Sequence, residues 1–361
     1  MDIFWLLNSA TTLTIFNNKT VIINLSGRLP NNNNFFRIGN MDTLHIETPL
    51  IESIPLGRKV KGKVWLKLEA LQPSGSFKLR GIGNACLTYL RKGAKKFVSS
   101  SGGNAGIAVA YSGRQLGIPV TVVVPESTTE RSIEAIKQEH AEVIVKGGTW
   151  QEAHDYSVKL TDSECIHIHP FDDPLLWDGH ATILDEVKKS GLSPDVVVLS
   201  VGGGGLMCGI IEGLCRNNMA TVPVIAVETD GADSLSASLS AGQHLEIEDI
   251  TSVATSLGAK KVAKAAYDWC YKHEVVSHVV SDIDAVDACL EFSKDHRLLV
   301  EPACGATLSA LYNPIEFLMD KKNILVVVCG GAGVMIDKMN DWKQKLDNNC
   351  MHQMLGSTEE A

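Results

Sequence analysis

The sequence predicts an α/β protein with two open, mostly parallel β-sheets that carry helices on both faces. From Met41 onward, short runs rich in valine and isoleucine alternate with amphipathic stretches, which is the pattern of parallel sheets. Runs such as VTVVV and ILVVV are apolar at every position, so both faces of each sheet should be covered. The strand candidates are too many for one compact sheet, which predicts two sheets with a ligand cleft at the carboxyl ends of their strands.

The expected elements follow one another along the chain, and glycine or proline stands near many of their ends. Strands are predicted for the β-branched runs at 62–69, 96–101, 120–125, 141–147, 165–170, 195–201, 223–229, 277–282 and 323–331. Helices are predicted where apolar residues recur at helical spacing, at 104–116, 129–140, 150–162, 174–189, 283–297 and 333–346. Two more helices are expected to begin at Lys78 and after the glycines at 202–205.

Length and composition restrict the class of protein. The 361 residues with 45% apolar content can bury a large core in one or two domains. The net charge of −9 is spread without long blocks of one sign, so we expect no nucleic-acid surface, no membrane-surface helix and a small-molecule partner. The nine cysteines are an odd number without a C-x-x-C pair, which indicates reduced thiols and a cytoplasmic protein.

Residues 1–40 are predicted to be a disordered extension that precedes the folded part. The run MDIFWLLNSATTLTIFNN lacks the basic start of a secretory signal peptide. An organelle-targeting presequence is the alternative, because Asp2 is the only acid in this segment. The rest of the chain is predicted to form a large domain (41–71 and 172–346), a small domain (72–171) and a flexible tail (347–361).

The stretch PSGSFKLRG (73–81) places Lys78 at the start of a helix. The first turn of a helix carries partial positive charge, so a cation is unfavourable there. A partly desolvated ammonium group in this position loses its proton more readily and can act as nucleophile or base. Lys78 is therefore the candidate catalytic residue.

Four glycines, Gly202 to Gly205, lie between the predicted strand at 195–201 and a helix. Backbone N–H groups without side chains in the way can converge on a phosphate, and the helix N-terminus adds favourable potential. Neither G-x-G-x-x-G nor G-x-x-x-x-G-K-[ST] fits these glycines, which argues against dinucleotide and P-loop sites. A glycine turn that serves only tight packing is the alternative.

A second run of small residues, SSSGGNAG (99–106), also leads into a helix. Exposed amides and hydroxyls at such a place suit a carboxylate, and Asn104 offers a donor and an acceptor to a ring oxygen. Ordinary helix capping is the alternative for this motif alone. Together, the lysine, the carboxylate-type turn and the phosphate-type turn predict a phosphorylated aldehyde cofactor and an amino-acid substrate.

These motifs resemble those of the fold-type II pyridoxal-phosphate enzymes, in particular the branch of L-serine dehydratase/L-threonine deaminase and the serine dehydratase-like proteins. The resemblance spans roughly residues 41–346 and includes PSGSFKLRG, SSSGGNAGIAVAYSGRQLGIP, PFDDPLLWDGHA, LSVGGGGLMCG, VIAVETDGADS, ITSVATSLGAK, LVEPACGA and VVVCGG. It implies a tryptophan synthase β-like fold, with the cofactor in the cleft between two domains, and a homodimer.

The resemblance also implies roles for individual residues. The cofactor, pyridoxal 5'-phosphate, would be bound by Lys78, Phe77, Asn104, Gly202, Gly203, Gly204, Gly205, Leu206, Ser256 and Cys329. The substrate would be bound by Ser76, Ser101, Gly102, Gly103, Asn104 and Ala105. A monovalent cation, K⁺, would be bound by Gly202, Glu228, Ala232, Ser234 and Leu257. Cys329 would face the pyridine nitrogen, where a neutral thiol suits β-elimination.

The implied reaction converts L-serine to pyruvate and ammonia, and L-threonine to 2-oxobutanoate and ammonia. Lys78 would remove the Cα proton, and the β-hydroxyl would leave with a proton from the cofactor phosphate. The alternatives are a serine racemase or a cysteine or cystathionine synthase of the same fold, and a pyridoxal-phosphate-binding protein without turnover. Leu79 replaces the acid of the synthases and Gly102 replaces the hydroxyl residue of the racemases, so the dehydratase is favoured.

Four other residues keep more than one interpretation. His167 and His169 point to one face of a predicted strand at a spacing that metal sites use, but no nearby cysteine or acid cluster completes a ligand set. His180 and Glu301 lie in family motifs, and each could be an ordinary residue at a helix start. The chain has no G-x-S-x-G motif, which argues against a serine hydrolase.

Overall fold

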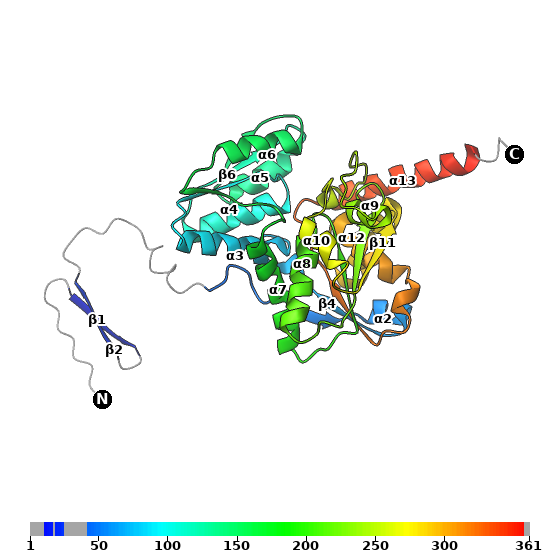
Figure 1. Ribbon diagram of the computed structural model, residues 1–361, viewed down its shortest axis with the longest axis horizontal. Helices are drawn as coiled ribbons and strands as arrows, with labels where there is room; N and C mark the ends of the chain where they lie inside the picture. Colours follow the sequence, from blue (N-terminus) through cyan, green and yellow to red (C-terminus); the bar gives the residue numbers. More distant parts are fainter. Residues whose placement is uncertain (1–10, 17–18, 25–41, 357–361) are drawn as a thin grey trace. The chain divides into compact units, whose positions relative to one another are not determined.

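The computed structural model describes residues 11–16, 19–24 and 42–356, and the chain divides into two units, 1–41 and 42–361 (Figure 1). In the first unit, the strands β1 (Thr11–Phe16) and β2 (Lys19–Asn24) pair antiparallel. The predicted extension 1–40 therefore contains a hairpin, and its remaining residues lie outside the described part of the chain. The organelle-targeting interpretation concerns the same residues and stays a prediction.

The second unit contains a six-stranded sheet in the order β11-β10-β9-β12-β4-β3. Its strands are β3 (Leu50–Glu52), β4 (Lys63–Lys67), β9 (Val196–Ser200), β10 (Val224–Thr229), β11 (Val275–Val280) and β12 (Asn323–Val327). Neighbouring strands run parallel except for the pair of β3 and β4. The strands β9 and β10 are buried at every position, including the polar residues at their carboxyl ends, as expected for strands covered on both faces.

A four-stranded sheet in the order β7-β6-β5-β8 completes the second unit. Its strands are β5 (Lys96–Ser99), β6 (Val120–Val124), β7 (Glu142–Val145) and β8 (Cys165–His167), and all are parallel. Residues of the predicted large domain form the six-stranded sheet, and residues of the predicted small domain form this one. The division into two domains itself stays a prediction.

The helices connect the strands. They are α2 (Ile54–Val60), α3 (Lys78–Arg91), α4 (Asn104–Leu116), α5 (Glu130–Gln138), α6 (Trp150–Lys159), α7 (Pro174–Lys189), α8 (Gly205–Arg216), α9 (Ser234–Ala241), α10 (Lys264–Trp269), α11 (Asp282–His296), α12 (Pro302–Tyr312) and α13 (Ile336–Gly356). Three 3₁₀ turns are η1 (Glu69–Leu71), η2 (Thr255–Leu257) and η3 (Glu316–Leu318). In the described ranges, no helix combines the length and the apolar character that a membrane span needs.

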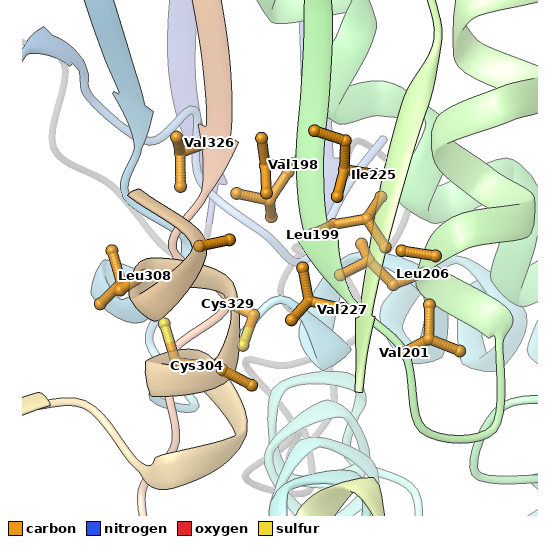
Figure 2. Packing of buried hydrophobic residues seen from close by; sticks show 14 of the residues in the cluster. Val198, Leu199, Val201, Leu206, Ile225, Val227, Cys304, Leu308, Val326 and Cys329 are labelled. Atoms are coloured by element: carbon orange, nitrogen blue, oxygen red, sulfur yellow. The ribbon is translucent and has the colours of Figure 1, made fainter. Parts of the chain in front are cut away.

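The core of the six-stranded sheet lies between its strands and the helices that cover it. Figure 2 shows Val198 of β9 beside Val326 of β12, with Cys304 and Leu308 of α12 near them, whereas Leu199 lies beside Leu206 of α8. The helix α12 is buried along its whole length, so it presents no polar face to water. Cys329 lies in the same packed layer, directly after β12.

The predicted α/β class with two mostly parallel sheets is confirmed. Each of the predicted runs overlaps a strand, although β11 begins two residues before its predicted run, and the helices at 104–116 and 174–189 have the predicted bounds. The helix α13 continues past residue 346 to Gly356, so part of the predicted flexible tail (347–361) is helical.

Candidate active site

One cavity collects the residues that were predicted to bind the cofactor. It is lined by Phe77, Lys78, Asn104, Phe171, Ser200, Gly202, Gly203, Gly204, Gly205, Leu206, Ser256, Leu257, Glu301, Ala303 and Cys329. The predicted cofactor contacts are all in this set, although they come from segments that are far apart in the chain. The cavity lies beyond the carboxyl ends of β9 and β12, where a parallel sheet is expected to bind ligands.

Lys78 is the first residue of α3, and the residue before it, Phe77, makes no side-chain hydrogen bond that caps the helix. The Lys78 Nζ donates a hydrogen bond to the carbonyl oxygen of Pro170 (2.7 Å) and lies 5.2 Å from the centre of the Phe77 ring. Burial lowers the pKa of Lys78 to about 8, although the nearby Cys329 and Glu301 act in the opposite direction. At pH 7 roughly a tenth of this amine is thus unprotonated, far more than for an ordinary lysine.

A buried ion network fixes the first turn of α3. Arg80 is fully buried, and its Nε donates to the Glu69 Oε2 (2.7 Å). Its Nη1 donates to the Glu186 Oε1 on α7 (2.6 Å), and Lys67 of β4 pairs with the same carboxylate. Because a buried guanidinium needs its full set of acceptors, this network leaves the start of α3 little freedom to move. Lys78 is thereby held in place two residues away.

The four glycines form a turn that leads into α8. Gly204 has φ +84°, a left-handed conformation that favours glycine, and a Cβ on Gly203 would lie 2.2 Å from the Phe171 Cγ. A Cβ on Gly202 would lie 2.9 Å from the Cα of Leu257. Side chains at these positions would collide with their neighbours, so the backbone of this turn stays bare where it lines the cavity. The turn therefore fits a phosphate group at the N-terminus of α8.

Asn104 is fixed at both ends of its side-chain amide. Its Oδ1 accepts the N–H of Ala332 (2.9 Å), and its Nδ2 donates to the Glu301 Oε1 (2.7 Å). Burial raises the pKa of Glu301 to about 7, against the opposing effects of Ser256, Asn104 and Lys78. Glu301 precedes α12 without capping it, so its carboxyl group is directed to the site instead. Glu301 is therefore a residue of the candidate site and not an ordinary residue at a helix start.

The thiol of Cys329 is held neutral. A hydrogen bond with Cys304 and burial raise the pKa of Cys329 well above its ordinary value. The Ser200 Oγ lies 3.6 Å from the Cys329 Sγ, within hydrogen-bond distance for sulfur. A neutral thiol and a hydroxyl therefore stand together at this wall of the cavity.

The predicted substrate residues lie on two segments. Ser101, Gly102, Gly103, Asn104 and Ala105 form the turn and the first residues of α4, and Gly103 and Asn104 line an outer pocket that adjoins the cavity. This outer pocket shares Asn104, Ser256, Glu301 and Ala303 with the cavity. The hydroxyl of Ser76 is buried and has no hydrogen-bond partner among the described residues. A buried hydroxyl without a partner is a candidate to form a hydrogen bond with a bound ligand.

The residues that were predicted to bind K⁺ do not all line the cavity. Gly202 and Leu257 line it, whereas Glu228 is the last residue but one of β10 and Ser234 begins α9. The Glu228 carboxylate accepts the N–H groups of Leu235 (2.9 Å) and Ser236 (2.8 Å), and Ala232 bridges to Thr229 in the same turn. Burial raises the pKa of Glu228 to about 8. The cation site stays a prediction.

His180 and three lining residues were not assigned a role from the sequence. His180 is buried on α7, its ring centre lies 4.9 Å from that of Phe77, and it supports the ring that faces the cavity. Phe171, Ser200 and Ala303 also line the cavity. Each of these residues lies within a motif named in the sequence analysis, and this position is the only feature of the sequence that could have indicated a role in the site.

Comparison with known proteins agrees with this geometry. Residues 41–330 match the family model described as "Pyridoxal-phosphate dependent enzyme". The chain belongs to this family. It is 45% identical to an L-serine dehydratase of Dictyostelium discoideum over 324 residues, which covers 84% of this chain and 93% of that protein. It is 43% identical to the human L-serine dehydratase/L-threonine deaminase over 316 residues, which covers 84% and 96%.

Two solved structures have the same fold as this chain. A fungal L-serine ammonia-lyase from Rhizomucor miehei superimposes with a TM-score of 0.81 at 36% identity, covering 84% of this chain and 99% of that chain. The processed form of threonine deaminase isoform 2 from Solanum lycopersicum gives a TM-score of 0.76 at 26% identity, covering 83% and 88%. The predicted cofactor, pyridoxal 5'-phosphate, is confirmed by the family.

Proposed function

We propose that this protein is an L-serine ammonia-lyase that converts L-serine to pyruvate and ammonia, and L-threonine to 2-oxobutanoate and ammonia. The observation that carries the proposal is the meeting of Lys78, whose pKa is lowered to about 8, with the glycine turn 202–205 and Asn104 in one cavity. The similarity to proteins named L-serine dehydratase supports the substrate class.

Lys78 is the proposed catalytic base. Pyridoxal phosphate, when bound, supplies an electron sink that allows the Cα–H bond of an amino acid to break. Lys78 would bind the cofactor aldehyde, and its free amine would take the Cα proton of the substrate, which its lowered pKa favours near neutral pH. The β-hydroxyl would leave as water, and the later hydrolysis would consume one water, so that L-serine yields pyruvate and ammonia.

The other lining residues would bind and orient. The N–H groups of Gly202 to Gly205 would hold the phosphate, and Phe77 would lie against the ring. Asn104 would donate to the ring oxygen, since Glu301 and Ala332 already fix its amide. The neutral thiol of Cys329 would face the pyridine nitrogen without holding it protonated, which suits elimination.

The substrate carboxylate is assigned to the turn 101–105 and to Ser76. The unpartnered hydroxyl of Ser76 and the backbone N–H groups of the first turn of α4 are donors that a carboxylate can use. A Cβ on Gly102 would lie 2.7 Å from the Thr128 Cγ2, so the side chain of Thr128 occupies the space next to this glycine. The Thr128 side chain therefore takes up the space beside the turn that a larger residue at position 102 would occupy.

Three further features belong to the same proposal. We place the protein in the cytoplasm, because its free cysteines include Cys86, Cys208 and Cys289, which are buried thiols. We propose a homodimer, as the family resemblance implies. We also propose K⁺ binding near Glu228, whose buried carboxylate would be neutralised by a cation.

The test is pyruvate formation from L-serine by the purified full-length protein. Lys78→Ala should lower the rate by about 10²-fold or more, since it removes the proposed base. Lys95→Ala is the matched control, because Lys95 is an exposed lysine on the surface and should leave the rate unchanged. The product from L-threonine, measured in parallel, tests the second substrate.

Each alternative activity has its own outcome in this assay. D-serine without pyruvate would identify a racemase, and a product that forms only with added sulfide would identify a synthase. Binding of pyridoxal phosphate without any product would indicate a protein that lacks turnover. Pyruvate formation that persists in Lys78→Ala would refute the role of the lysine.

A further inference from the structure

His169 lies on the turn between β8 and α7 and has no part in the chemistry described above. The His169 Nδ1 accepts the backbone N–H of Phe171 (3.2 Å) and the backbone N–H of Asp172 (2.7 Å). One imidazole nitrogen therefore satisfies two backbone donors of the same turn. This arrangement needs an unprotonated Nδ1, because a protonated ring nitrogen cannot accept.

The turn that His169 holds forms two parts of the cofactor cavity. The carbonyl oxygen of Pro170 accepts the hydrogen bond of the Lys78 Nζ (2.7 Å). The Phe171 ring packs against Gly203, and the Phe171 carbonyl oxygen lies 2.5 Å from where a Cβ on Gly205 would be. The rings of His169 and Phe171 meet edge to face, with their centres 4.7 Å apart. The lysine and the phosphate-type glycines thus border one turn.

The protonation state of His169 suits this role. Burial, together with the neighbouring His167, His154 and Lys78, lowers the pKa of His169 to about 3. The ring is therefore neutral at any pH at which the protein is expected to work. Its centre lies 6.0 Å from that of His154 and 6.4 Å from that of His167. Among the described residues, no group of histidine, cysteine and acidic side chains is arranged to hold a metal ion.

We propose that His169 is a positioning residue for the cofactor site: its unprotonated Nδ1 fixes the turn 169–172, which supports the Lys78 amine and closes the glycine turn. The inference rests on the proposed roles of Lys78 and the glycines in binding pyridoxal phosphate. It assigns no proton transfer to His169, which acts only through Pro170 and Phe171.

The test measures the affinity of the full-length protein for pyridoxal 5'-phosphate in an equilibrium titration followed by the absorbance of the bound cofactor. His169→Leu removes the acceptor and leaves two backbone N–H groups without a partner, so the dissociation constant should rise about tenfold or more. His169→Asn is the conservative variant, because its Oδ1 occupies the position of Nδ1 in the side chain. It should restore the dissociation constant to within about threefold of the wild-type value.

His167→Leu is the matched control. His167 lies in the same histidine cluster, but its Nε2 has no hydrogen-bond partner among the described residues and the turn does not depend on it. Its replacement should leave cofactor affinity within about threefold of wild type. If His169→Leu does not fold, His169→Gln takes its place, since its longer side chain moves the acceptor away from the turn.

Two outcomes would overturn the proposal. The first is wild-type affinity in a folded His169→Leu or His169→Gln variant. The second is an equal loss of affinity in His169→Asn and His169→Leu, which would show that the ring and not the acceptor matters. The readout does not need turnover, so a wild-type protein that binds pyridoxal phosphate without forming pyruvate would refute the proposed function and leave this test intact.

Discussion

Replacing Glu301 by glutamine should make the stability of the protein less sensitive to pH. The Glu301 side chain is 9% exposed, and burial raises its pKa from 4.5 to about 7. Between these two values the unfolded chain has lost the carboxyl proton while the folded protein retains it. The free energy of unfolding of the wild type therefore falls as the pH rises through this interval.

The size of the effect follows from the pKa shift. A difference of about 2.5 units, at about 1.4 kcal/mol per unit, corresponds to roughly 3 kcal/mol. This contribution is fully present below pH 4.5, and it is lost once the pH exceeds about 7. Glutamine keeps the Oε1 that accepts from Asn104 but cannot ionise. The variant should therefore gain about 2.5 kcal/mol relative to the wild type between about pH 5 and about pH 8, because part of the effect is already lost at pH 5.

The assay is denaturant unfolding of the cofactor-free, full-length proteins at both pH values. Glu248→Gln, at an exposed position, is the control and should change the difference by less than about 0.5 kcal/mol. If the stability difference between Glu301→Gln and the wild type is the same at both pH values, the carboxyl group ionises normally. The reasoning that places Glu301 in a desolvating site would then be refuted.

Three other predictions concern the elements that build the site. Arg80→Met should lower the free energy of unfolding by about 3–5 kcal/mol, because it leaves buried carboxylates unpaired. Arg114→Met, which breaks a partly exposed ion pair, should lower it by less than about 1 kcal/mol. Equal losses of the two variants in denaturant unfolding would contradict this prediction. Gly203→Ala should weaken cofactor binding about tenfold or more, because its Cβ would lie 2.2 Å from the ring in the β8–α7 turn. Gly148→Ala, whose nearest contact would be 3.8 Å away, should bind normally in the same titration. In the cofactor-free protein, Lys78 should react with an amine reagent with a midpoint near pH 8, as measured by peptide mass spectrometry, and a midpoint above about pH 10, as for exposed lysines, would be inconsistent with its burial.

The elements with a local signal were predictable from the sequence. The helices α4 and α7 begin and end at the predicted residues, since Asn104 follows a small-residue turn and Pro174 suits a first helical turn. The strand β3 was not predicted because its three residues, Leu50–Glu52, are too short for a periodic pattern. The helix α12 is apolar all round, so it shows no amphipathic spacing from which a helix could be recognised.

The cofactor contacts were predictable only through the motifs that carry them. Lys78 and the glycines at 202–205 can be recognised as candidate site residues because a cation and a run of glycines are unusual at the start of a helix. Glu301 and His169 do not, because their roles depend on Asn104 and on the backbone of Phe171, and the pairing of Glu301 with Asn104 spans 197 residues of sequence. Contacts of this kind form only in the packed fold, so no local pattern in the sequence predicts them.

The position of β12 in the six-stranded sheet affects the order in which the protein can be assembled during synthesis. It is the last strand in the described part of the chain, yet it lies between β9 and β4, with Val326 opposite both Val198 and Leu66. Without residues 323–327, β4 and β9 would each present a row of unpaired backbone N–H and C=O groups at the edge that β12 covers. The backbone N–H of Phe77 bonds to the carbonyl oxygen of Cys329, just after this strand (3.1 Å). Lys78 and the glycines at 202–205 follow segments that β12 joins, so the cofactor site is complete only once β12 has taken its place in the sheet.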